Sequence, residues 1–300
     1  MEWTNRRSLS VGHTQERWRM GLLDGKVAVI TGAARGQGRA HAMRFAEEGA
    51  DIIAMDICRD VETVPYKGAT REDLDRTVAA VEMLGRRIIA SETDVRDGRA
   101  VTEAIDHGVA SFGRLDAVVA NAGITSYVRA QEMSEESWTT MIDINLSGVW
   151  RTCRAAIPHM IDAGRGGSLT LTSSTSSYIG LPNLNHYSAA KGGVVSLMQS
   201  LAVELGPHMI RVNTLHPTTV KTPMALNQPT YDLFLPGAGL SADRLEDEQE
   251  VAEAFKGLNA MPIPWVEPVD LANAAVFLAS DMGRYISGTQ LRVDAGSGVK

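Results

Sequence analysis

Short apolar runs alternate with amphipathic segments along almost the whole chain. Continuous apolar runs of this length are typical of strands buried on both faces of a parallel sheet, and the intervening segments have a helical period. The apolar runs occupy residues 26–31, 51–56, 87–92, 116–121, 167–173, 210–217 and 290–296. The helical segments include 41–49, 73–84, 101–112 and 187–205. The alternation predicts right-handed crossovers and an α/β fold, a doubly wound parallel sheet of the Rossmann type.

We expect one domain over residues 21–300, because the chain shows no break in composition and no internal repeat. Residues 1–20 contain a twin arginine without an apolar stretch behind it, which predicts a flexible extension and not a secretion signal. The net charge of −7 and the absence of a long apolar stretch argue against nucleic acid and membrane partners. Cys58 and Cys153 form no CxxC pair, so we expect a cytoplasmic protein without a metal site, whose partner is a small molecule.

The segment TGAARGQG, residues 31–38, directly follows the first apolar run and opens a helix. Its glycines at 32, 36 and 38 leave the backbone free to approach a pyrophosphate, beside the positive end of the helix. The alternative is a glycine-rich turn that serves only helix–strand packing. The position between a strand and a helix, 18 residues before the acidic Asp56, favours a dinucleotide site.

Asp56 ends the second apolar run and bears on the choice of dinucleotide. Its carboxylate can accept hydrogen bonds from the ribose hydroxyls of NAD, whereas the extra phosphate of NADP would meet like charge. Arg35 and Arg59 offer the alternative of a positive partner for that phosphate. The balance favours NAD.

Polar residues also follow the third and fourth apolar runs, at 94–95 and 121–123. Ligands of open parallel sheets bind at the carboxyl ends of strands. Asn121 is equally well explained as the cap of a turn. We expect both segments to contribute to the dinucleotide site.

The segment YSAAK places Tyr187 and Lys191 on one face at the start of a strong helix. A phenol with a pKa near 10 needs roughly 4 kcal/mol in favour of the phenolate to act as a base near pH 7. An ammonium about 4 Å away supplies about 4 kcal/mol at an effective dielectric constant near 20. Together with the positive charge of an oxidised nicotinamide, Lys191 is therefore expected to make Tyr187 a general base.

Two further residues strengthen this otherwise weak pattern. Ser174 follows the fifth apolar run, thirteen residues before Tyr187, and is placed to hold a substrate oxygen. Asn145 lies in the segment DINLSG. Without the Tyr and Lys, Ser174 would be explained as one serine of the polar run TSSTSSY.

These residues resemble the short-chain dehydrogenase/reductase family over residues 24–298. The resemblance implies that Tyr187 is the acid/base and that Lys191 also holds the nicotinamide ribose. It implies that Ser174 orients the substrate oxygen and that Asn145 supports a water relay. It also implies that the protein forms a homotetramer or, less often in the family, a dimer.

The segment HPTTVKT, residues 216–222, is similar to the family's P-G-x-V-x-T pattern, with Thr218 in place of the glycine. This departure puts the backbone path beside the nicotinamide amide in question. The complete predicted cofactor site consists of Gly32, Arg35, Gly36, Gln37, Gly38, Asp56, Ile57, Asp94, Val95, Asn121, Ala122, Gly123, Tyr187, Lys191, Pro217, Val220 and Thr222.

Residues 57–70, here called the flap, form a connection longer than the 2 to 6 residues usual between a strand and a helix. A tolerated surface insertion is the alternative explanation. Because the flap begins immediately after Asp56, we expect residues 64–66 to cover the adenosine half of NAD. The flap, together with TGAARGQGRAHA, MDIC and HYSAAKGGVV, resembles a subfamily that is coupled to the peptide-derived redox carrier mycofactocin and includes carveol dehydrogenases. This implies NAD that is held tightly and re-oxidised in place.

Residues 222–267, here called the lid, are too long for a plain connection. Their apolar side chains include Met224, Leu226, Tyr231, Phe234, Leu235, Met261, Ile263 and Trp265. They suit a hydrophobic secondary alcohol, such as a terpenoid, although packing of the lid onto the body explains half of them equally well. The sequence thus predicts an NAD-dependent alcohol dehydrogenase. The alternatives are an enzyme with freely exchanging cofactor and a nucleotide-sensing protein without chemistry.

Overall fold

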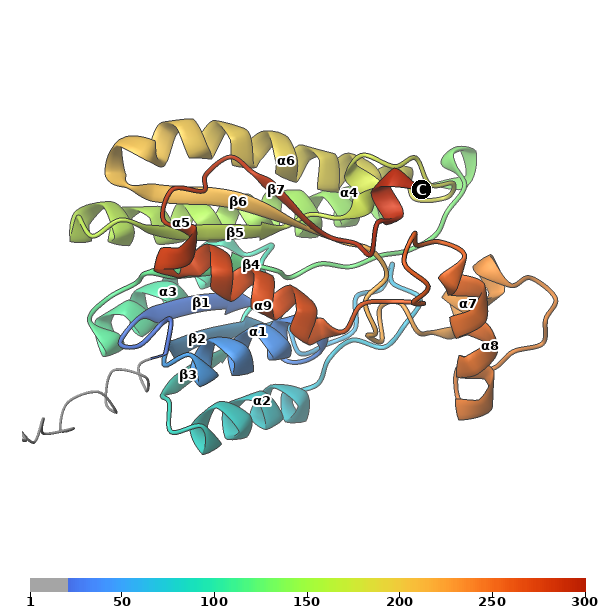
Figure 1. Ribbon diagram of the computed structural model, residues 1–300, viewed down its shortest axis with the longest axis horizontal. Helices are drawn as coiled ribbons and strands as arrows, with labels where there is room; N and C mark the ends of the chain where they lie inside the picture. The colour runs from blue at the N-terminus through green and yellow to red at the C-terminus, as the bar shows by residue number, and fades with distance from the viewer. Residues whose placement is uncertain (1–20) are drawn as a thin grey trace, which may run out of the picture.

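The computed structural model describes residues 21–300, so the extension predicted for residues 1–20 lies outside the described residues. Seven strands form one parallel sheet in the order β3-β2-β1-β4-β5-β6-β7 (Figure 1). The strands are β1 Val27–Thr31, β2 Asp51–Asp56, β3 Ile88–Glu92, β4 Ala117–Ala120, β5 Gly167–Thr172, β6 Ile210–Pro217 and β7 Gln290–Val293. Each lies within the apolar run predicted for it, and the predicted α/β fold is confirmed.

Helices cover both faces of this sheet. They are α1 Gly36–Glu47, α2 Arg71–Met83, α3 Gly98–Phe112, α4 Glu135–Ile142, α5 Gly148–Ala163, α6 Asn185–Leu205, α7 Gln228–Phe234, α8 Leu245–Lys256 and α9 Pro268–Ala279. The four segments named from their helical period correspond to α1, α2, α3 and α6. None of the helices within residues 21–300 is long and apolar enough to cross a membrane.

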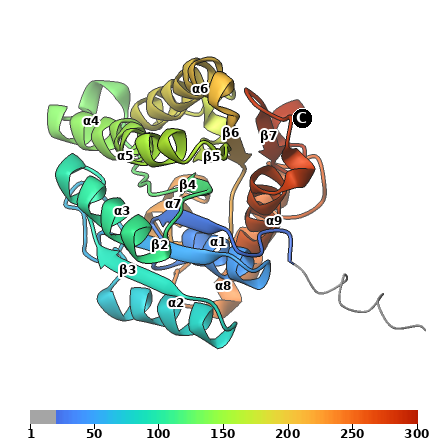
Figure 2. The same ribbon diagram turned by 90° about the vertical axis from the view of Figure 1, so that its left-hand side faces the viewer.

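Successive strand residues point to opposite faces and build two separate apolar cores. Val27 and Val29 pack on the side of α3, α5 and α6. Ala28 and Ile30 pack on the side of α1, α2 and α9. Figure 2 shows the two groups of helices on opposite sides of the sheet. Because both faces are buried, the ends of the strands are where the sheet remains open to a ligand.

The strand order reverses direction at β1, which pairs with β2 on one side and β4 on the other. The connections after β1 and β4 therefore depart to opposite faces and leave a crevice at the carboxyl ends of these strands. The glycine motif follows β1, Asp56 ends β2, and residues 121–123 follow β4. Topology alone brings these three predicted segments to one crevice.

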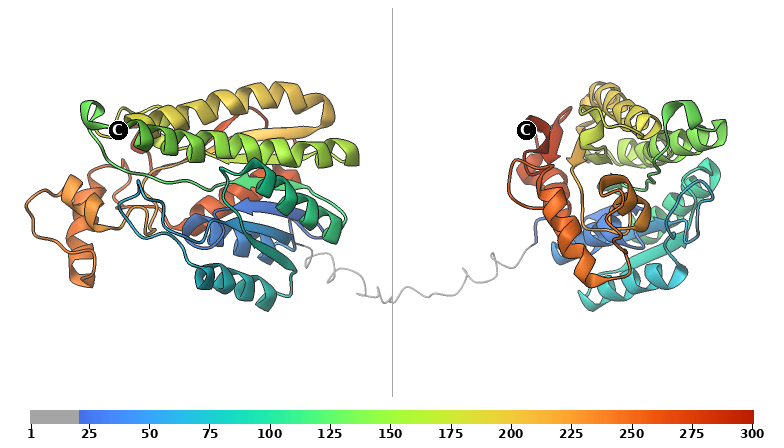
Figure 3. Two further views of the ribbon diagram at one scale, coloured as in Figure 1. Left: turned by 180° about the vertical axis from the view of Figure 1, so that it is seen from behind. Right: turned by 90° about the vertical axis from the view of Figure 1, so that its right-hand side faces the viewer.

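The lid leaves the body after β6 and carries α7 and α8, which project beyond the carboxyl ends of the strands (Figure 3). A parallel bridge between Val220 and Val266 closes its base. Within the lid, Tyr231, Val251 and Phe255 form a small apolar core of their own. The lid is thus a folded unit on two short stems.

A buried carboxylate fastens the amino end of β2 to β3. Asp51, with a side chain only 4% exposed, accepts hydrogen bonds from Arg86 at 2.7 Å and from the Arg87 Nε at 2.7 Å. Burial opposes ionisation of Asp51, but these bonds and the Arg87 backbone N–H together hold its pKa below the ordinary value. The ionised form is therefore part of the folded structure.

We expect Asp51→Asn to lower the free energy of unfolding by roughly 2 kcal/mol at pH 7, because charge-assisted bonds to a buried group are lost. The depressed pKa means that this stabilisation is present above about pH 4 and is lost as pH falls through the folded-state pKa. Urea unfolding of both proteins at several pH values measures it. Asp75→Asn removes an exposed partner of Arg71 and should cost less than about 1 kcal/mol. Equal losses in the two variants would contradict the role of burial.

Candidate active site

The glycine motif forms a tight turn between β1 and α1. Gly32 and Gly36 have left-handed φ values of +67° and +54°, which favour glycine. A Cβ at Gly38 would lie 1.8 Å from the Gly32 carbonyl oxygen, so this glycine is required for helix–strand packing. All three also line the crevice. The packing explanation and the cofactor explanation both hold for this motif.

A cavity lies at the carboxyl ends of β1, β2 and β4, between the flap and the start of the lid. Its wall contains these predicted cofactor residues: Gly32, Arg35, Gly36, Gln37, Gly38, Asp56, Ile57, Asp94, Val95, Asn121, Ala122, Gly123 and Thr222. Tyr187, Lys191, Pro217 and Val220 do not line it. The wall also contains residues that were not predicted, namely Val61, Gly68, Ala69, Thr93, Ile124, Ile144 and Pro223. Thr93, Ile124, Ile144 and Pro223 each adjoin a predicted site residue, and this adjacency was the available signal.

Asp56 is buried, and each of its carboxylate oxygens accepts one backbone hydrogen bond. Oδ2 accepts from the Ala34 N–H at 2.9 Å, and Oδ1 accepts from the Cys58 N–H at 3.1 Å. A carboxylate oxygen has two lone pairs, so both oxygens can still accept a ribose hydroxyl. The two bonds fix the carboxylate toward the cavity.

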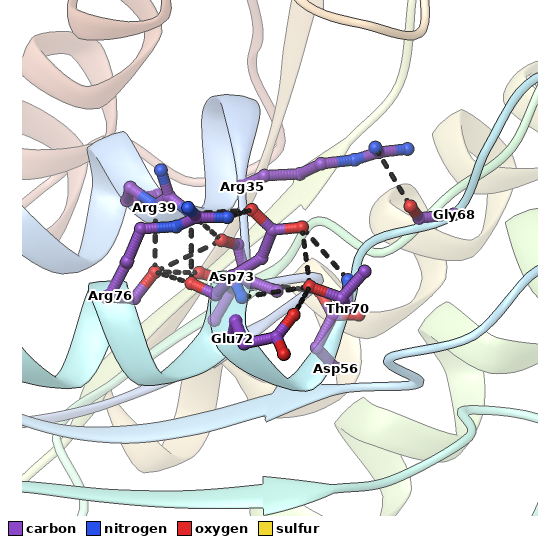
Figure 4. Close-up of polar contacts among 11 residues, drawn as sticks. Arg35, Arg39, Asp56, Gly68, Thr70, Glu72, Asp73 and Arg76 are labelled. Atoms are coloured by element: carbon purple, nitrogen blue, oxygen red, sulfur yellow. Dashed lines mark hydrogen bonds and ion pairs between the residues drawn. The ribbon is translucent and has the colours of Figure 1, made fainter.

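The two arginines considered as partners for a 2′-phosphate are already engaged. Arg35 donates to the backbone carbonyls of Lys67 and Gly68, the latter at 3.1 Å (Figure 4). Arg59 donates to Asp94 at 3.1 Å. With Asp56 facing the cavity and both guanidinium groups paired, the site favours NAD over NADP.

The donor set of this cavity fits a dinucleotide. The Gln37 side-chain oxygen is buried and has no hydrogen-bond partner among the described residues. The Arg35 side chain makes no cap at the start of α1. Backbone N–H groups at this helix end therefore remain for an anion, and Asp56 remains for a ribose.

The flap crosses the cavity instead of lying on the surface. Val61 and Val64 pack against a cluster that contains Ile124 and Ile144, and Tyr187 packs against the same cluster. The flap therefore has packing contacts beside the cavity, which favour a role there over a merely tolerated insertion.

The expected extent of the flap needs correction. Val64 and Tyr66 line the cavity, but Pro65 is exposed and does not. The Tyr66 hydroxyl accepts a hydrogen bond from the Thr125 N–H at 3.2 Å, beyond Gly123. The flap therefore extends beyond the end of the cavity near Asp56, because the Tyr66 side chain reaches the segment that follows β4.

Asn145 lies in a π-helical turn, Asp143–Ser147, between α4 and α5. Such turns occur frequently at functional sites. Its side-chain oxygen accepts from the Ile124 N–H at 2.9 Å, and its nitrogen donates to the Ile124 carbonyl at 2.8 Å. The fully buried amide thereby fixes the backbone that leaves the cavity.

The other three residues predicted to act in catalysis, Ser174, Tyr187 and Lys191, form one group next to Gly123. The Ser174 side chain lies close to the Tyr187 side chain and lowers the pKa of Tyr187. A Cβ at Gly123 would lie 2.9 Å from the Asn145 oxygen and 3.5 Å from the Lys191 Nζ. The absence of a side chain at Gly123 thus connects the cavity to the predicted catalytic group.

The electrostatic expectation for Tyr187 is not met by the protein chain alone. Burial raises the pKa of Tyr187 to about 12, outweighing the opposite effect of the nearby Ser174. Lys191 donates to the Thr172 carbonyl at 2.7 Å, and its Nζ lies 5.7 Å from the centre of the Tyr187 ring. Burial lowers the pKa of Lys191 to about 8. Desolvation was absent from the estimate made on sequence, and it reverses the direction of the shift.

The inference from the apolar composition of the lid to the substrate also requires correction. Leu226, Tyr231, Leu235 and Trp265 belong to the apolar core of the lid. Phe234, Met261 and Ile263 are largely exposed. Of the apolar lid residues named above, Met224 alone lines the cavity. Packing therefore explains half of these residues, as expected, but the lid is packed on itself and not onto the body.

Thr218, the departure from the family pattern, has a specific contact. Its hydroxyl donates to the side-chain oxygen of Asn259 at 3.1 Å, which ties the end of β6 to the returning stem of the lid. Thr218 is not among the residues with positive φ, so no glycine is required there. Pro217 ends β6, and Val220 packs against Val266 and Leu271.

Comparison with known proteins agrees with this geometry. Residues 32–298 match the family model described as enoyl-(acyl carrier protein) reductase. The chain is 49% identical to a (−)-trans-carveol dehydrogenase of Rhodococcus erythropolis, over 94% of this chain and 100% of the relative.

Two solved structures are similar throughout. A carveol dehydrogenase from Mycobacterium avium in complex with NAD superposes with a TM-score of 0.89 at 50% identity, covering 93% of this chain and 100% of that one. A short-chain dehydrogenase from Mycobacterium paratuberculosis bound to NAD gives 0.82 at 41% identity, with the same coverage. The chain belongs to the short-chain dehydrogenase/reductase family.

Proposed function

We propose that this protein is an NAD-dependent dehydrogenase of hydrophobic secondary alcohols, with a terpenoid alcohol of the carveol type as substrate. The observation that carries the proposal is the proximity of Ser174, Tyr187 and Lys191, placed where the cavity that holds Asp56 ends at Gly123. The name of the Rhodococcus relative supports the alcohol class. The NAD complexes of two similar structures support the cofactor.

Each residue of the site has a defined part in the reaction. Bound NAD supplies the acceptor for the hydride. The Ser174 hydroxyl holds the alcohol oxygen, and Tyr187 accepts the hydroxyl proton. Lys191 supplies positive charge near the phenol, and Asn145 keeps the backbone at Ile124 in place. A nucleotide-sensing protein would not need this set, so chemistry is the better proposal.

The elevated pKa sets how much stabilisation the phenolate requires. A shift in the Tyr187 pKa from about 12 to 7 corresponds to about 7 kcal/mol. One unit charge at 4 Å contributes about 4 kcal/mol at an effective dielectric constant of 20. The pKa of about 12 already includes Lys191, whose Nζ is directed to the Thr172 carbonyl, so a further positive charge is needed before Tyr187 accepts a proton. Tyr187 would therefore accept the proton of the alcohol only while oxidised NAD is bound.

We further propose that NAD is retained between turnovers and re-oxidised in place by an external carrier of the mycofactocin type. The flap is anchored at two places, by Arg35 to Lys67 and Gly68 and by Tyr66 to Thr125. Release of a dinucleotide would require both anchors to open. Ordinary exchange of free NAD is the competing proposal.

The proposed assembly is a cytoplasmic homotetramer. Trp138 on α4 and Trp150 on α5 are 40% and 43% exposed, and Val203 on α6 is 80% exposed. Large apolar side chains on these helices suit burial between subunits.

We expect Tyr187→Phe to lower kcat for carveol oxidation by at least about a hundredfold, because the proton acceptor is lost while the ring remains. Stopped-flow measurement of NADH formation in a single turnover detects this. The amount of bound NAD should be unchanged. Retention of wild-type rates would favour a different base.

The pH dependence tests the electrostatic proposal. Alcohol oxidation requires the phenolate, so kcat should rise with pH and level off above the apparent pKa of the loaded enzyme. Lys191→Met should move that pKa upward by roughly two pH units, since one nearby cation is removed. Lys221→Met removes a lid cation that pairs with Glu248 and should leave the profile unmoved. An unaltered pH profile in Lys191→Met would exclude Lys191 as the positive charge that lowers the pKa of Tyr187.

Native mass spectrometry of freshly purified protein should show a tetramer that carries NAD. Repeated turnover with carveol and free NAD should be slow, whereas an electron-accepting dye should support many turnovers. Ready loss of NAD on dialysis, with fast turnover on free NAD, would overturn retention but leave the dehydrogenase proposal intact.

A further inference from the structure

The segment Ile124–Val128, which follows β4 and is here called the strap, has an unusual set of contacts. Each of its five residues is hydrogen-bonded to a different residue from outside the segment. The pairs are Ile124 with Asn145, Thr125 with Tyr66, Ser126 with His186, Tyr127 with Thr230 and Val128 with Asn183. These partners come from the flap, the lid, the α4–α5 turn and the approach to α6. The strap is therefore a junction between both covers and the body.

The contact with the flap is made by the Tyr66 hydroxyl, which accepts the Thr125 N–H at 3.2 Å. Burial raises the pKa of Tyr66, so the phenol stays neutral and protonated at working pH. The Tyr66 side chain also lines the cofactor cavity. One side chain thus touches both the cavity and the strap.

The contact with the lid lies two residues further on. The Tyr127 hydroxyl is 3.3 Å from the Thr230 Oγ1 at the start of α7. Thr230 donates its proton to the Asn227 side-chain oxygen at 3.0 Å, so Tyr127 is the donor in the pair. Thr230 is only 2% exposed, which places this bond inside the lid junction.

The remaining contacts hold the strap beside the reacting groups. Ser126 lies 3.0 Å from the Nε2 of His186, which is fully buried and directly precedes Tyr187. Asn145 fixes Ile124 from the other side. A displacement of the strap therefore moves the surroundings of Tyr187.

We propose that Tyr66 and Tyr127 are positioning residues that hold the strap between flap and lid, so that the two covers open and close together. When the flap opens, the Thr125 N–H loses its bond to Tyr66. The strap is then held less firmly, which weakens the bond from Tyr127 to Thr230 and lets the lid open. The reverse path runs from Thr230 to the flap. Alcohol binding under the lid would in this way strengthen retention of NAD under the flap. The retention part rests on the proposed function, whereas the coupling of the covers does not.

Hydrogen exchange of the full chain, in the absence of any alcohol, tests the coupling directly. Tyr127→Phe removes one hydroxyl, whose hydrogen bond is to Thr230 of the lid and not to the flap. We expect this variant to accelerate amide exchange in peptides from the flap, residues 57–70, by roughly three- to tenfold. Tyr66→Phe should accelerate exchange in the lid helix α7 by a similar factor. In the double variant, amide exchange should be only slightly faster than in the more affected single variant, because both substitutions loosen the same strap.

Tyr285→Phe is the matched control, since it removes a hydroxyl from a side chain that is 80% exposed. It should leave exchange in both covers unchanged. If Tyr127→Phe alters only strap and lid peptides while the flap exchanges as in the wild type, the coupling is overturned.

A second readout links the strap to the reaction. Loss of NAD on dilution, followed by native mass spectrometry, should be slowed by added trans-carveol in the wild type. In Tyr127→Phe this effect of trans-carveol should disappear, and the KM for trans-carveol should rise roughly three- to tenfold with kcat less affected. An effect of trans-carveol on NAD loss that is equal in both proteins would overturn the proposal. Absence of carveol oxidation by the wild type would instead count against the proposed substrate, while the exchange experiment would still decide the coupling.

Discussion

Burial of both faces of the parallel sheet is the constraint on which the rest of this structure depends. Val27 and Val29 on one face and Ala28 and Ile30 on the other leave no room for a ligand beside the strands. Chemistry is therefore confined to the carboxyl ends, and the reversal at β1 decides which ends open into a cavity. The glycine turn, the carboxylate that ends β2 and the segment after β4 meet there because of strand order. Flap, strap and lid are additions to that one edge.

The same burial that builds the site works against its chemistry. A phenol removed from water resists ionisation, and the pKa of Tyr187 rises to about 12 in the protein chain alone. Lys191 directs its Nζ to the Thr172 carbonyl and is itself destabilised as a cation by burial. In the proposed mechanism, Tyr187 is thus a proton acceptor that is held neutral until further positive charge enters the cavity. Desolvation would then supply a dependence on cofactor state, which a solvent-exposed tyrosine would lack.

Periodicity and spacing predicted the strands, the doubly wound parallel sheet and the positions of Asp56 and residues 121–123, because each depends on local pattern and on the handedness of crossovers. The resemblance implied that Ser174 and Tyr187 belong to one catalytic group, and the structure places them close together. The contact of Tyr66 with Thr125 joins residues 59 positions apart, and no local signal encodes it. Composition also could not show that the lid would form its own core. Both failures concern where a side chain points after folding, which is decided by tertiary contacts.

Magnitudes indicate how the flap could hold a dinucleotide. The hydrogen bonds from Arg35 to Gly68 and from Thr125 to Tyr66 contribute about 1 kcal/mol each, enough to slow opening about thirtyfold. Val61 and Val64 are half-buried against the cluster at Ile124 and contribute about 2 kcal/mol together. The sum of about 4 kcal/mol corresponds to roughly a thousandfold. Neither class of contact is sufficient alone. The hydrogen bonds determine where the flap lies, and the apolar contacts double the free energy that holds it, so polar substitution of both valines would weaken retention as much as the loss of both anchors.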